Sequence, residues 1–324
     1  MAFKASHVLT LSVLLSGCGG GGGGGGSSSA PASSDPTVNY TPQAFVTMDS
    51  IQDGTTVRFS GPSVQTDLTV NPGVAVTNLY NVGDTGNSTV DVTYDFNGRI
   101  IKLDLNHSLG TNLVFQGSEG DVVADASTYL GSEFEGILFA TGDSGAKFGM
   151  AADGKNADID FNYQTFGVWE KGRGTTSGEV VATSVGVTTV NVPASGSATF
   201  SGWTGGAFLD TAGEYDYLTA SELTAVADFS ARSVSITSEN TVMYNMIAER
   251  LTTDPNAGAA LDFTGTLTYS ANSNSLSGSM TTTGGPTGTM TASFYGPNAE
   301  EIGGTFHGTG TGFELFTGSF GAKR

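Results

Sequence analysis

The chain has 324 residues, with 31 acidic and 12 basic side chains and a formal charge of −19 at neutral pH. This negative charge disfavours nucleic acid and anionic membrane surfaces as partners. A single cysteine excludes an internal disulfide, and 48 glycines among frequent Ser and Thr favour short strands joined by turns, the pattern of an all-β protein.

The N-terminal segment predicts a lipid anchor. Leu15-Ser16-Gly17-Cys18 forms a lipobox after the apolar stretch from Val8 to Leu15. A stretch this short fits a cleaved signal peptide and not a mature membrane-spanning helix. We therefore expect residues 1–17 to be a lipoprotein signal peptide, and Cys18 to carry acyl chains such as palmitate that hold the protein to a membrane. A lone buried cysteine is the alternative, but the glycine run after Cys18 supplies no core.

A flexible tether is predicted to follow. Eight glycines, Gly19 to Gly26, lead into Ser, Ala and Pro up to Pro36, a stretch with neither apolar side chains to bury nor periodicity. We therefore expect a tether over residues 18–40. About twenty such residues have a reach of roughly 25 Å. Gly19 stands where an aspartate would signal inner-membrane retention, so we expect an outer-membrane, lipid-anchored protein.

The clearest hairpin lies in the first half of the chain. Alternating apolar residues run from Val90 to Leu105 around Asn97-Gly98, which suits the positive φ angles of a type I′ turn. One face of this hairpin is wholly apolar, so it buries one side. The expected facing pairs are Val90 and Leu105, Val92 and Leu103, and Tyr94 and Ile101.

Related hairpins recur in the second half. Asp228 to Arg232 repeats the Asp-Phe-x-x-Arg pattern of Asp95 to Arg99. Two β domains built from related hairpins is one interpretation, and chance similarity of short hairpins is the other. We expect two β-rich domains, the first over residues 41–190 and the second over residues 191–324. The expected pairs are Ala227 with Val234, Ala225 with Ile236, and Leu267 with Gly278.

The last strands predict a closed barrel. Large residues alternate with small ones on one face of each strand, as in the crowded interior of a small barrel. Thr305 lies on the opposite face and should contribute little to stability. Between two strands, Asn298 and Glu301 are placed to form the capping box of one helical turn. The residues expected inside are Phe294, Phe306, Phe316 and Phe320.

The segment from Phe294 to Phe306, Phe-Tyr-Gly-Pro-Asn-Ala-Glu-Glu-Ile-Gly-Gly-Thr-Phe, and the ending from Gly318 to Arg324 resemble the end of the barrel domain of transferrin-binding protein B and related bacterial surface lipoproteins. The resemblance implies an irregular β-rich handle domain followed by an eight-stranded antiparallel barrel. It also implies outer-membrane anchoring and ligand binding. Transferrin-binding protein B has two such lobes and this chain has room for one, so the resemblance does not extend to transferrin itself as the ligand.

Cofactor and metal sites are weakly indicated. His107, in a predicted turn, and His307, expected to point outward from a strand, are candidate haem ligands or ordinary surface histidines. Asp153, Asn156 and the pair Asp158 and Asp160 form an acidic loop that is either a calcium site or a solvated turn, and its spacing is not that of an EF-hand. We expect no resident metal or cofactor.

Aromatic residues supply the candidate ligand contacts. The run from Phe161 to Trp169 is either a central handle strand or an exposed binding loop, and the run from Trp203 to Phe208 poses the same alternatives. The proposed contacts are Trp169, Trp203, Phe166 and Phe208. No serine–histidine–aspartate set or phosphate loop stands out, so we do not expect an enzyme.

These patterns together predict a surface lipoprotein that binds an extracellular protein, haem or another solute. The family resemblance suggests a role in iron or haem acquisition together with an outer-membrane transporter. An adhesin or structural surface protein without a nutrient ligand is the leading alternative. A secreted glycan-active enzyme is the third.

Overall fold

The computed structural model describes twelve segments of the chain, and residues Ala44–Arg324 group into one compact unit. The signal segment, the tether, the Asn97-Gly98 turn and the acidic loop of residues 153–160 lie outside the described residues. The described residues are 56–71, 75–94, 100–108, 112–130, 137–142, 147–152, 161–172, 177–210, 216–246, 250–252, 254–310 and 313–324.

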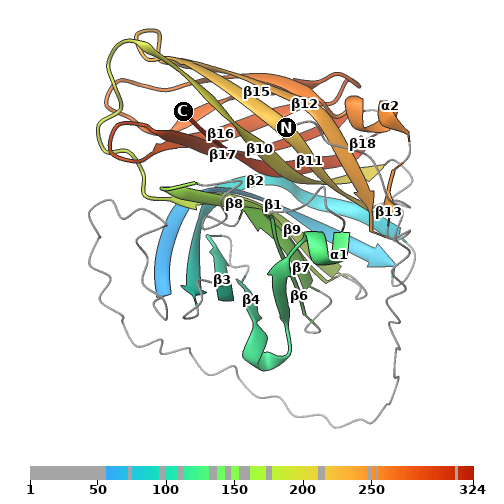
Figure 1. Cartoon of the computed structure of the whole chain (residues 1–324). Helices are drawn as coiled ribbons and strands as arrows, with labels where there is room; N and C mark the ends of the chain where they lie inside the picture. The colour runs from blue at the N-terminus through green and yellow to red at the C-terminus, as the bar shows by residue number, and fades with distance from the viewer. Residues whose placement is uncertain are drawn as a thin grey trace, which may run out of the picture. The chain divides into compact units, whose positions relative to one another are not determined.

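The first half of the chain forms a curled sheet of nine antiparallel strands, in the order β4-β3-β2-β1-β9-β8-β7-β6-β5 (Figure 1). Its edge strands β4 and β5 contact each other, so the sheet encloses an interior. Two single-turn helices, η2 (Gly117–Glu119) and α1 (Ser127–Leu130), flank β5. The strands are β1 (Thr56–Asn71), β2 (Ala75–Tyr94), β3 (Ile100–His107), β4 (Asn112–Gln116), β5 (Val122–Asp125), β6 (Ile137–Gly142), β7 (Lys147–Ala152), β8 (Gln164–Lys171) and β9 (Ser177–Gly186).

The register of the β2–β3 hairpin is confirmed in part. Val90 pairs with Leu105 and Val92 pairs with Leu103, as the alternation predicts. The predicted pairing of Tyr94 with Ile101 is wrong, because an irregularity after Thr93 brings Ile100 opposite Tyr94 instead. Strands with an extra residue on one side are bulged, and a strict period of two cannot reveal such a residue.

The second half of the chain forms a closed antiparallel barrel of eight strands, which confirms the predicted fold class. Seven pairings link β11-β10-β18-β17-β16-β15-β14-β12, and the pairing of β11 with β12 closes the ring. The short β13 (Arg250–Leu251) extends from β12, and Asp254 caps helix α2 (Pro255–Ala259). The barrel strands are β10 (Ser197–Asp210), β11 (Asp216–Asp228), β12 (Ser233–Asn245), β14 (Phe263–Thr268), β15 (Leu276–Thr282), β16 (Thr287–Tyr295), β17 (Glu301–Gly310) and β18 (Phe313–Lys323).

The hairpin registers predicted for the barrel are confirmed. Ala227 pairs with Val234, and Ala225 pairs with Ile236. Between β11 and β12 the turn ends at Arg232, whose φ of 54° lies in the left-handed region. Leu267 lies opposite Gly278, as expected for a turn centred on residues 272–273.

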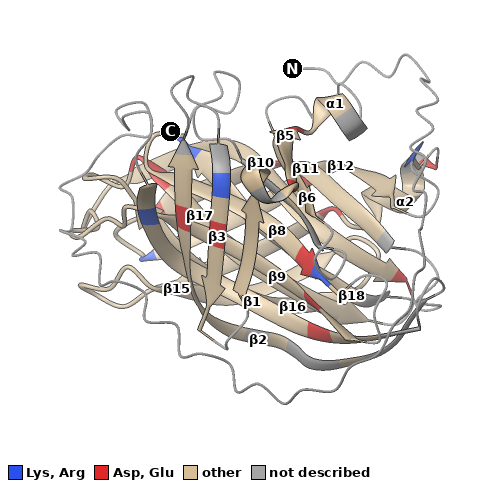
Figure 2. Ribbon diagram, turned by 90° about the horizontal axis from the view of Figure 1, so that it is seen from below, with Lys and Arg blue, Asp and Glu red and all other residues tan. Residues whose placement is uncertain are grey.

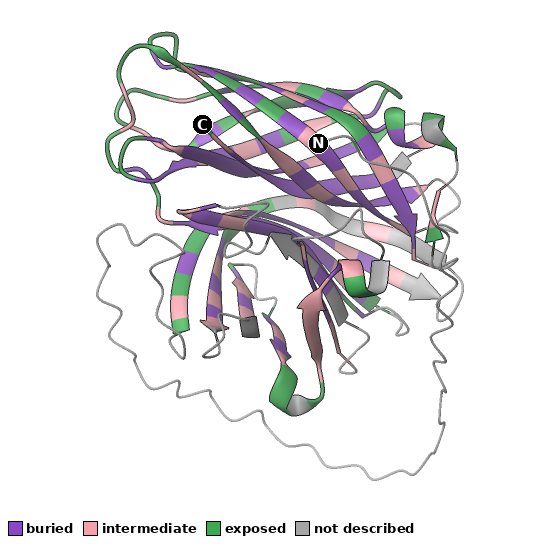
Figure 3. Cartoon of the chain, viewed as in Figure 1, coloured by how far each residue is buried: buried purple, intermediate pink, exposed green. Residues whose placement is uncertain are grey.

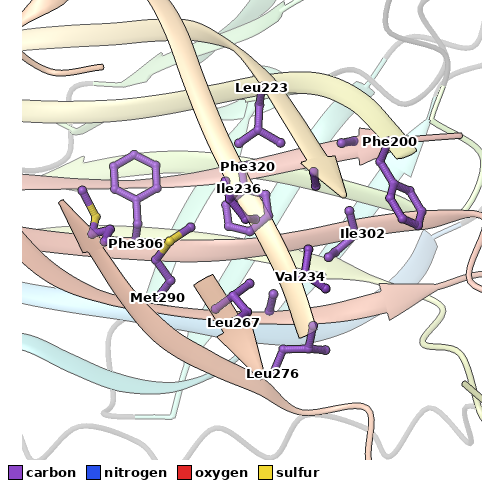
Figure 4. Close-up of a cluster of buried hydrophobic side chains, with 14 of the residues drawn as sticks. Phe200, Leu223, Val234, Ile236, Leu267, Leu276, Met290, Ile302, Phe306 and Phe320 are labelled. Carbon is purple, nitrogen blue, oxygen red and sulfur yellow. The ribbon is translucent and has the colours of Figure 1, made fainter. Parts of the chain in front are cut away.

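Side chains fill the barrel interior, as the alternation of large and small residues predicts. Along the barrel strands of Figure 3, buried positions alternate with exposed or partly exposed ones. In the close-up of Figure 4, Phe306, Met290 and Leu267 point into one cluster from three different strands. The four phenylalanines predicted to face inward, Phe294, Phe306, Phe316 and Phe320, are each at most 2% exposed.

The predicted helical turn after β16 is wrong. Residues 296–299 form a non-helical turn in which Ala299 has a φ of 59°, a left-handed conformation that ends a helical path. Glu301 opens strand β17 and does not complete a capping box. Instead, the backbone N–H of Asn298 donates to the carboxylate of Glu300 at 2.8 Å.

Candidate binding site at the handle–barrel junction

Strands β17 and β18 of the barrel are buried on both faces. One face lines the barrel interior, and the other contacts strands β8 and β9 of the curled sheet. Thr305 therefore lies outside the barrel interior, as predicted, yet it is only 1% exposed. Its hydroxyl lies 3.0 Å from that of Thr291. The small expected contribution of Thr305 to stability assumed that this face of β17 is exposed. That premise is wrong, because the first sheet covers this face.

Side-chain hydrogen bonds join the two sheets. The carboxylate of Glu301, 2% exposed, accepts from the backbone N–H of Asn162 at 2.5 Å and that of Tyr163 at 3.1 Å. The Gln164 amide donates to the carbonyl of Ile302 at 2.9 Å. Two hydroxyl groups also donate across the junction. Ser319 Oγ donates to the Gly167 carbonyl at 2.8 Å, and Tyr295 Oη donates to the Ser184 carbonyl at 2.9 Å.

We expect Glu301→Gln to destabilise the chain by about 2 kcal/mol, because hydrogen bonds to a charged group are worth about 1.5–3 kcal/mol each and a neutral amide keeps only part of them. Urea unfolding of residues 18–324, made without acyl chains, measures the change. Glu239→Gln, at an exposed position in the middle of β12, is the matched control. Equal midpoints for wild type and Glu301→Gln would contradict the assigned role of this carboxylate.

His307 lies at the same junction and not on an open surface. A Cβ added at Gly83 of β2 would overlap the His307 ring, so the ring lies directly against that backbone. Burial lowers the pKa of His307 below its ordinary value of 6.5. The other candidate haem ligand, His107, is the last residue of β3 and 5% exposed, so it does not lie in the predicted turn.

The pKa of His307 predicts acid sensitivity. Its lowered pKa means that the folded chain favours the neutral ring, so the unfolded chain binds more protons below pH 6.5. This contribution to stability is therefore complete above pH 6.5 and is lost as the pH falls below it. We expect the unfolding midpoint in urea to fall between pH 7 and pH 5 less steeply in His307→Gln than in wild type. Identical pH profiles would contradict this.

The structure does not bring the four candidate aromatic contacts into one site. Trp169 is 2% exposed in the interior of the curled sheet, with its ring 5.7 Å from that of Phe115. Phe208 belongs to the barrel core. Phe166 and Trp203 pack together at the junction, Phe166 being 6% exposed and Trp203 partly exposed. Trp169, Phe166 and Phe208 are therefore buried, as the alternative of a core position predicts. Ligand contact by these residues stays a prediction.

Trp203 begins a row of side chains that the sequence analysis missed. It lies opposite Glu222 of β11, which in turn lies opposite Glu239 of β12. Asn240 donates to the Glu222 carboxylate at 3.0 Å. Figure 2 shows that Lys, Arg, Asp and Glu occupy little of the described ribbon, and strand pairing places two of these carboxylates in line with the Trp203 indole. We call Trp203, Glu222 and Glu239 the Trp203 row.

Cross-strand register alone makes this row, since its members are 19 and 17 residues apart in sequence. The partly exposed indole offers apolar contact area, and the carboxylates attract Lys or Arg side chains of a partner. Such an arrangement suits contact with a basic patch on another protein.

Among the residues that the structure describes, no group of three or more His, Cys, Asp or Glu side chains could hold a metal ion. The proposed calcium loop, Asp153 to Asp160, lies outside them, so that alternative stays a prediction. Within the same segments, no helix has the length and apolar character needed to cross a membrane.

The fold is that of a two-part β protein, with a curled sheet ahead of a closed eight-stranded barrel. Residues 192–324 match the family model described as the C-lobe and N-lobe beta barrels of Tf-binding protein B. The barrel is therefore of the transferrin-binding protein B type, which confirms the resemblance noted in the C-terminal sequence. No curated protein matches the chain with significant similarity.

The solved structures to which the chain is similar include transferrin-binding protein B from three bacteria. The protein of Haemophilus parasuis, as a Trp-176-Ala mutant, is 10% identical with a TM-score of 0.39, over 84% of this chain and 76% of that one. The Neisseria meningitidis protein is 13% identical with a TM-score of 0.37, over 84% and 77%. A Phe-171-Ala mutant from Actinobacillus pleuropneumoniae is 15% identical with a TM-score of 0.34, over 81% and 99%.

Proposed function

We propose that this protein is an outer-membrane lipoprotein, displayed at the cell surface through acyl chains on Cys18, that binds an extracellular ligand in iron or haem acquisition. The family match of residues 192–324 is the observation that supports it most directly. That family is named for transferrin binding, and its barrels occur in both lobes of its proteins. The proposed organisation is a signal peptide (1–17), a tether (18–40), a handle domain (41–190) and a barrel domain (191–324).

The binding surface we propose is the Trp203 row on the outer wall of the barrel. Side chains fill the barrel interior, so a macromolecular ligand would contact outer surfaces and loops. The chain carries 31 acidic residues against 12 basic ones, which favours a basic patch on the partner. An extracellular protein is therefore the proposed ligand, with an outer-membrane transporter as a further partner.

Affinity capture tests this proposal. Residues 18–324, made without acyl chains and fixed to a support, are exposed to host serum, and the eluate is read by mass spectrometry and visible absorbance. We expect an iron- or haem-carrying protein to be captured, and Trp203→Ala with Glu222→Gln to retain less of it while remaining folded, as its unfolding transition shows. Val226→Ala, which removes a 46% exposed apolar side chain elsewhere on β11, is the control. Capture of matrix proteins instead would favour the adhesin alternative.

The proposed anchor predicts that Cys18→Ala abolishes acyl labelling. The lipobox requires the cysteine thiol as the site of acylation, and the chain has no other cysteine. Metabolic labelling with palmitate and partitioning into detergent measure the loss. Ser16→Ala changes a neighbouring position and should still be labelled. Equal labelling of wild type and Cys18→Ala would refute the anchor.

A further inference from the structure

The interior face of the curled sheet carries a group of buried polar side chains. Ser63, Ser88 and Thr183 are at most 1% exposed, and Trp169 is 2% exposed. They share this face with apolar side chains two residues away, such as Val90 and Val181. We call Ser63, Ser88, Thr183 and Trp169 the interior cluster.

Strand pairing places the cluster members side by side. Ser63 of β1 lies directly opposite Thr183 of β9, and residues in this relation have Cβ atoms roughly 4.5–5.5 Å apart. Ser88 of β2 is diagonal to Ser63, because it pairs with Gly61. Trp169 of β8 pairs with Val181, two residues from Thr183, so it is diagonal to Thr183.

Two neighbouring glycines show how the rings lie. A Cβ added at Gly149 of β7 would overlap the Cε3 and Cζ3 edge of Trp169, so the opposite edge, which carries Nε1, is turned away from that backbone. A Cβ at Gly86, which pairs with Ser63, would lie 3.2 Å from Cε1 and 3.3 Å from Nε2 of His107. The His107 ring therefore extends from β3 over β2 toward Ser63.

The polar atoms of the cluster are buried without hydrogen-bond partners. This holds for the hydroxyl oxygens of Ser63, Ser88 and Thr183 and for Nε1 of Trp169. Buried polar groups in native proteins nearly always have a partner, because an unpaired one keeps its full desolvation penalty. Four such atoms on one face of one sheet need partners from outside the polypeptide, which are either bound water or a ligand.

We propose that the interior of the curled sheet is a binding site for a small uncharged molecule that carries oxygen acceptors on an apolar body. The indole N–H can only donate, and hydroxyl groups donate or accept, so the ligand must offer acceptors. Small-molecule sites typically combine apolar walls with a few converging polar groups, and here Phe59 and Phe115 supply the walls.

The cluster itself is uncharged, which sets the ligand class. Asp67 and Glu179, which pair with each other, lie on this face four residues beyond Ser63 and Thr183. The site is distinct from the Trp203 row, which lies on the outer wall of the barrel, and it does not depend on the proposed function.

A pair of probe molecules tests the site. Coumarin is an uncharged bicyclic lactone with two oxygen acceptors, and naphthalene is a bicyclic hydrocarbon of similar size without acceptors. Ligand-observed NMR titrations with residues 18–324, made without acyl chains, give both affinities. We expect saturable one-to-one binding of coumarin, at least tenfold tighter than that of naphthalene. Absence of coumarin binding at millimolar concentration, or equal affinity for the two probes, would overturn the proposal.

Paired variants locate the binding. Ser63→Ala with Thr183→Val removes two hydroxyls at nearly constant shape and should weaken coumarin binding at least tenfold. Without a probe, its thermal midpoint should equal or exceed that of wild type, because unpaired buried hydroxyls are lost. The control, Ser279→Ala with Thr266→Val, makes the same changes at exposed positions on the barrel and should leave affinity unchanged. Unchanged coumarin affinity in the cluster variant would overturn the proposal. A lowered thermal midpoint would overturn it too, because it would show that bound water alone already pairs these hydroxyls.

Discussion

Phe306→Ala is expected to lower the free energy of unfolding by about 3–5 kcal/mol, the usual cost of removing a buried phenylalanine ring. Phe306 is 1% exposed, and its ring centroid lies 4.9 Å from that of Phe263 and 5.0 Å from that of Phe316. The barrel is closed, so neighbouring strands cannot move inward freely to fill the resulting cavity. Urea unfolding of residues 18–324 followed by circular dichroism measures the loss.

Thr266→Ala is the matched control for this variant. Thr266 lies on the exposed outer face of β14, where surface substitutions usually change stability by at most about 0.5 kcal/mol. Thr305 is unsuitable as a control, because the first sheet buries it. Similar losses in Phe306→Ala and Thr266→Ala would mean that the inward face of the barrel is misassigned.

Trp169→Ala is expected to cost about 3–5 kcal/mol as well, and the loss should appear in the curled sheet. The indole is 2% exposed and packs against Phe115 in the main apolar cluster of that sheet. We therefore expect a lowered unfolding midpoint for this variant. If Trp169 were instead a surface contact, the variant would keep its midpoint and only bind its partner less well. Guanidinium unfolding monitored by far-ultraviolet circular dichroism measures this midpoint.

Trp203→Ala provides the comparison, since Trp203 is the other tryptophan and is partly exposed. Its substitution should cost less stability than that of Trp169 while reducing partner capture. Each variant leaves one tryptophan, so the fluorescence of Trp169 alone should be more blue-shifted than that of Trp203 alone. A native-like midpoint for Trp169→Ala would contradict its assignment to the core.

The barrel was predictable because its signal is local. Large inward side chains alternate with small or polar ones along each strand, and a centred turn fixes the register between neighbours. The pairs Ala227 with Val234 and Leu267 with Gly278 follow from these two rules. The rules fail at Tyr94, where one additional residue in the paired strands shifts the register without changing the polar and apolar pattern.

The junction was not predictable for the opposite reason, because its partners are distant in sequence. Thr305, Glu301 and His307 have the polarity of exposed strand and turn residues. The structure buries them under a sheet whose outer face supplies backbone N–H groups and a glycine. Alternation shows which side chains leave the barrel interior. It does not show which part of the outer wall another sheet covers.

The candidate site illustrates the same limit. Aromatic density singled out Trp203, whose contact with a ligand stays a prediction, and it also singled out Trp169 and Phe208, which pack inside the two sheets. Aromatic residues fill cores as readily as they form contact surfaces, and a single sequence does not distinguish the two uses. Glu222 and Glu239 had no local signal, since only the pairing of β10, β11 and β12 brings them beside Trp203.

The hydrogen bonds across the junction have a consequence for the order of folding. The hydrogen-bonded residues Asn162 and Glu301 are 139 residues apart, and Gln164 and Ile302 are 138 residues apart. Such long loops make these contacts slow to form, and strands β17 and β18 follow all nine strands of the curled sheet in the chain. The curled sheet is therefore synthesised first, and the outer face of β8 and β9 stays uncovered until β17 and β18 have been made. Docking of the curled sheet on the barrel is consequently a late step of folding, because it needs strands from both parts.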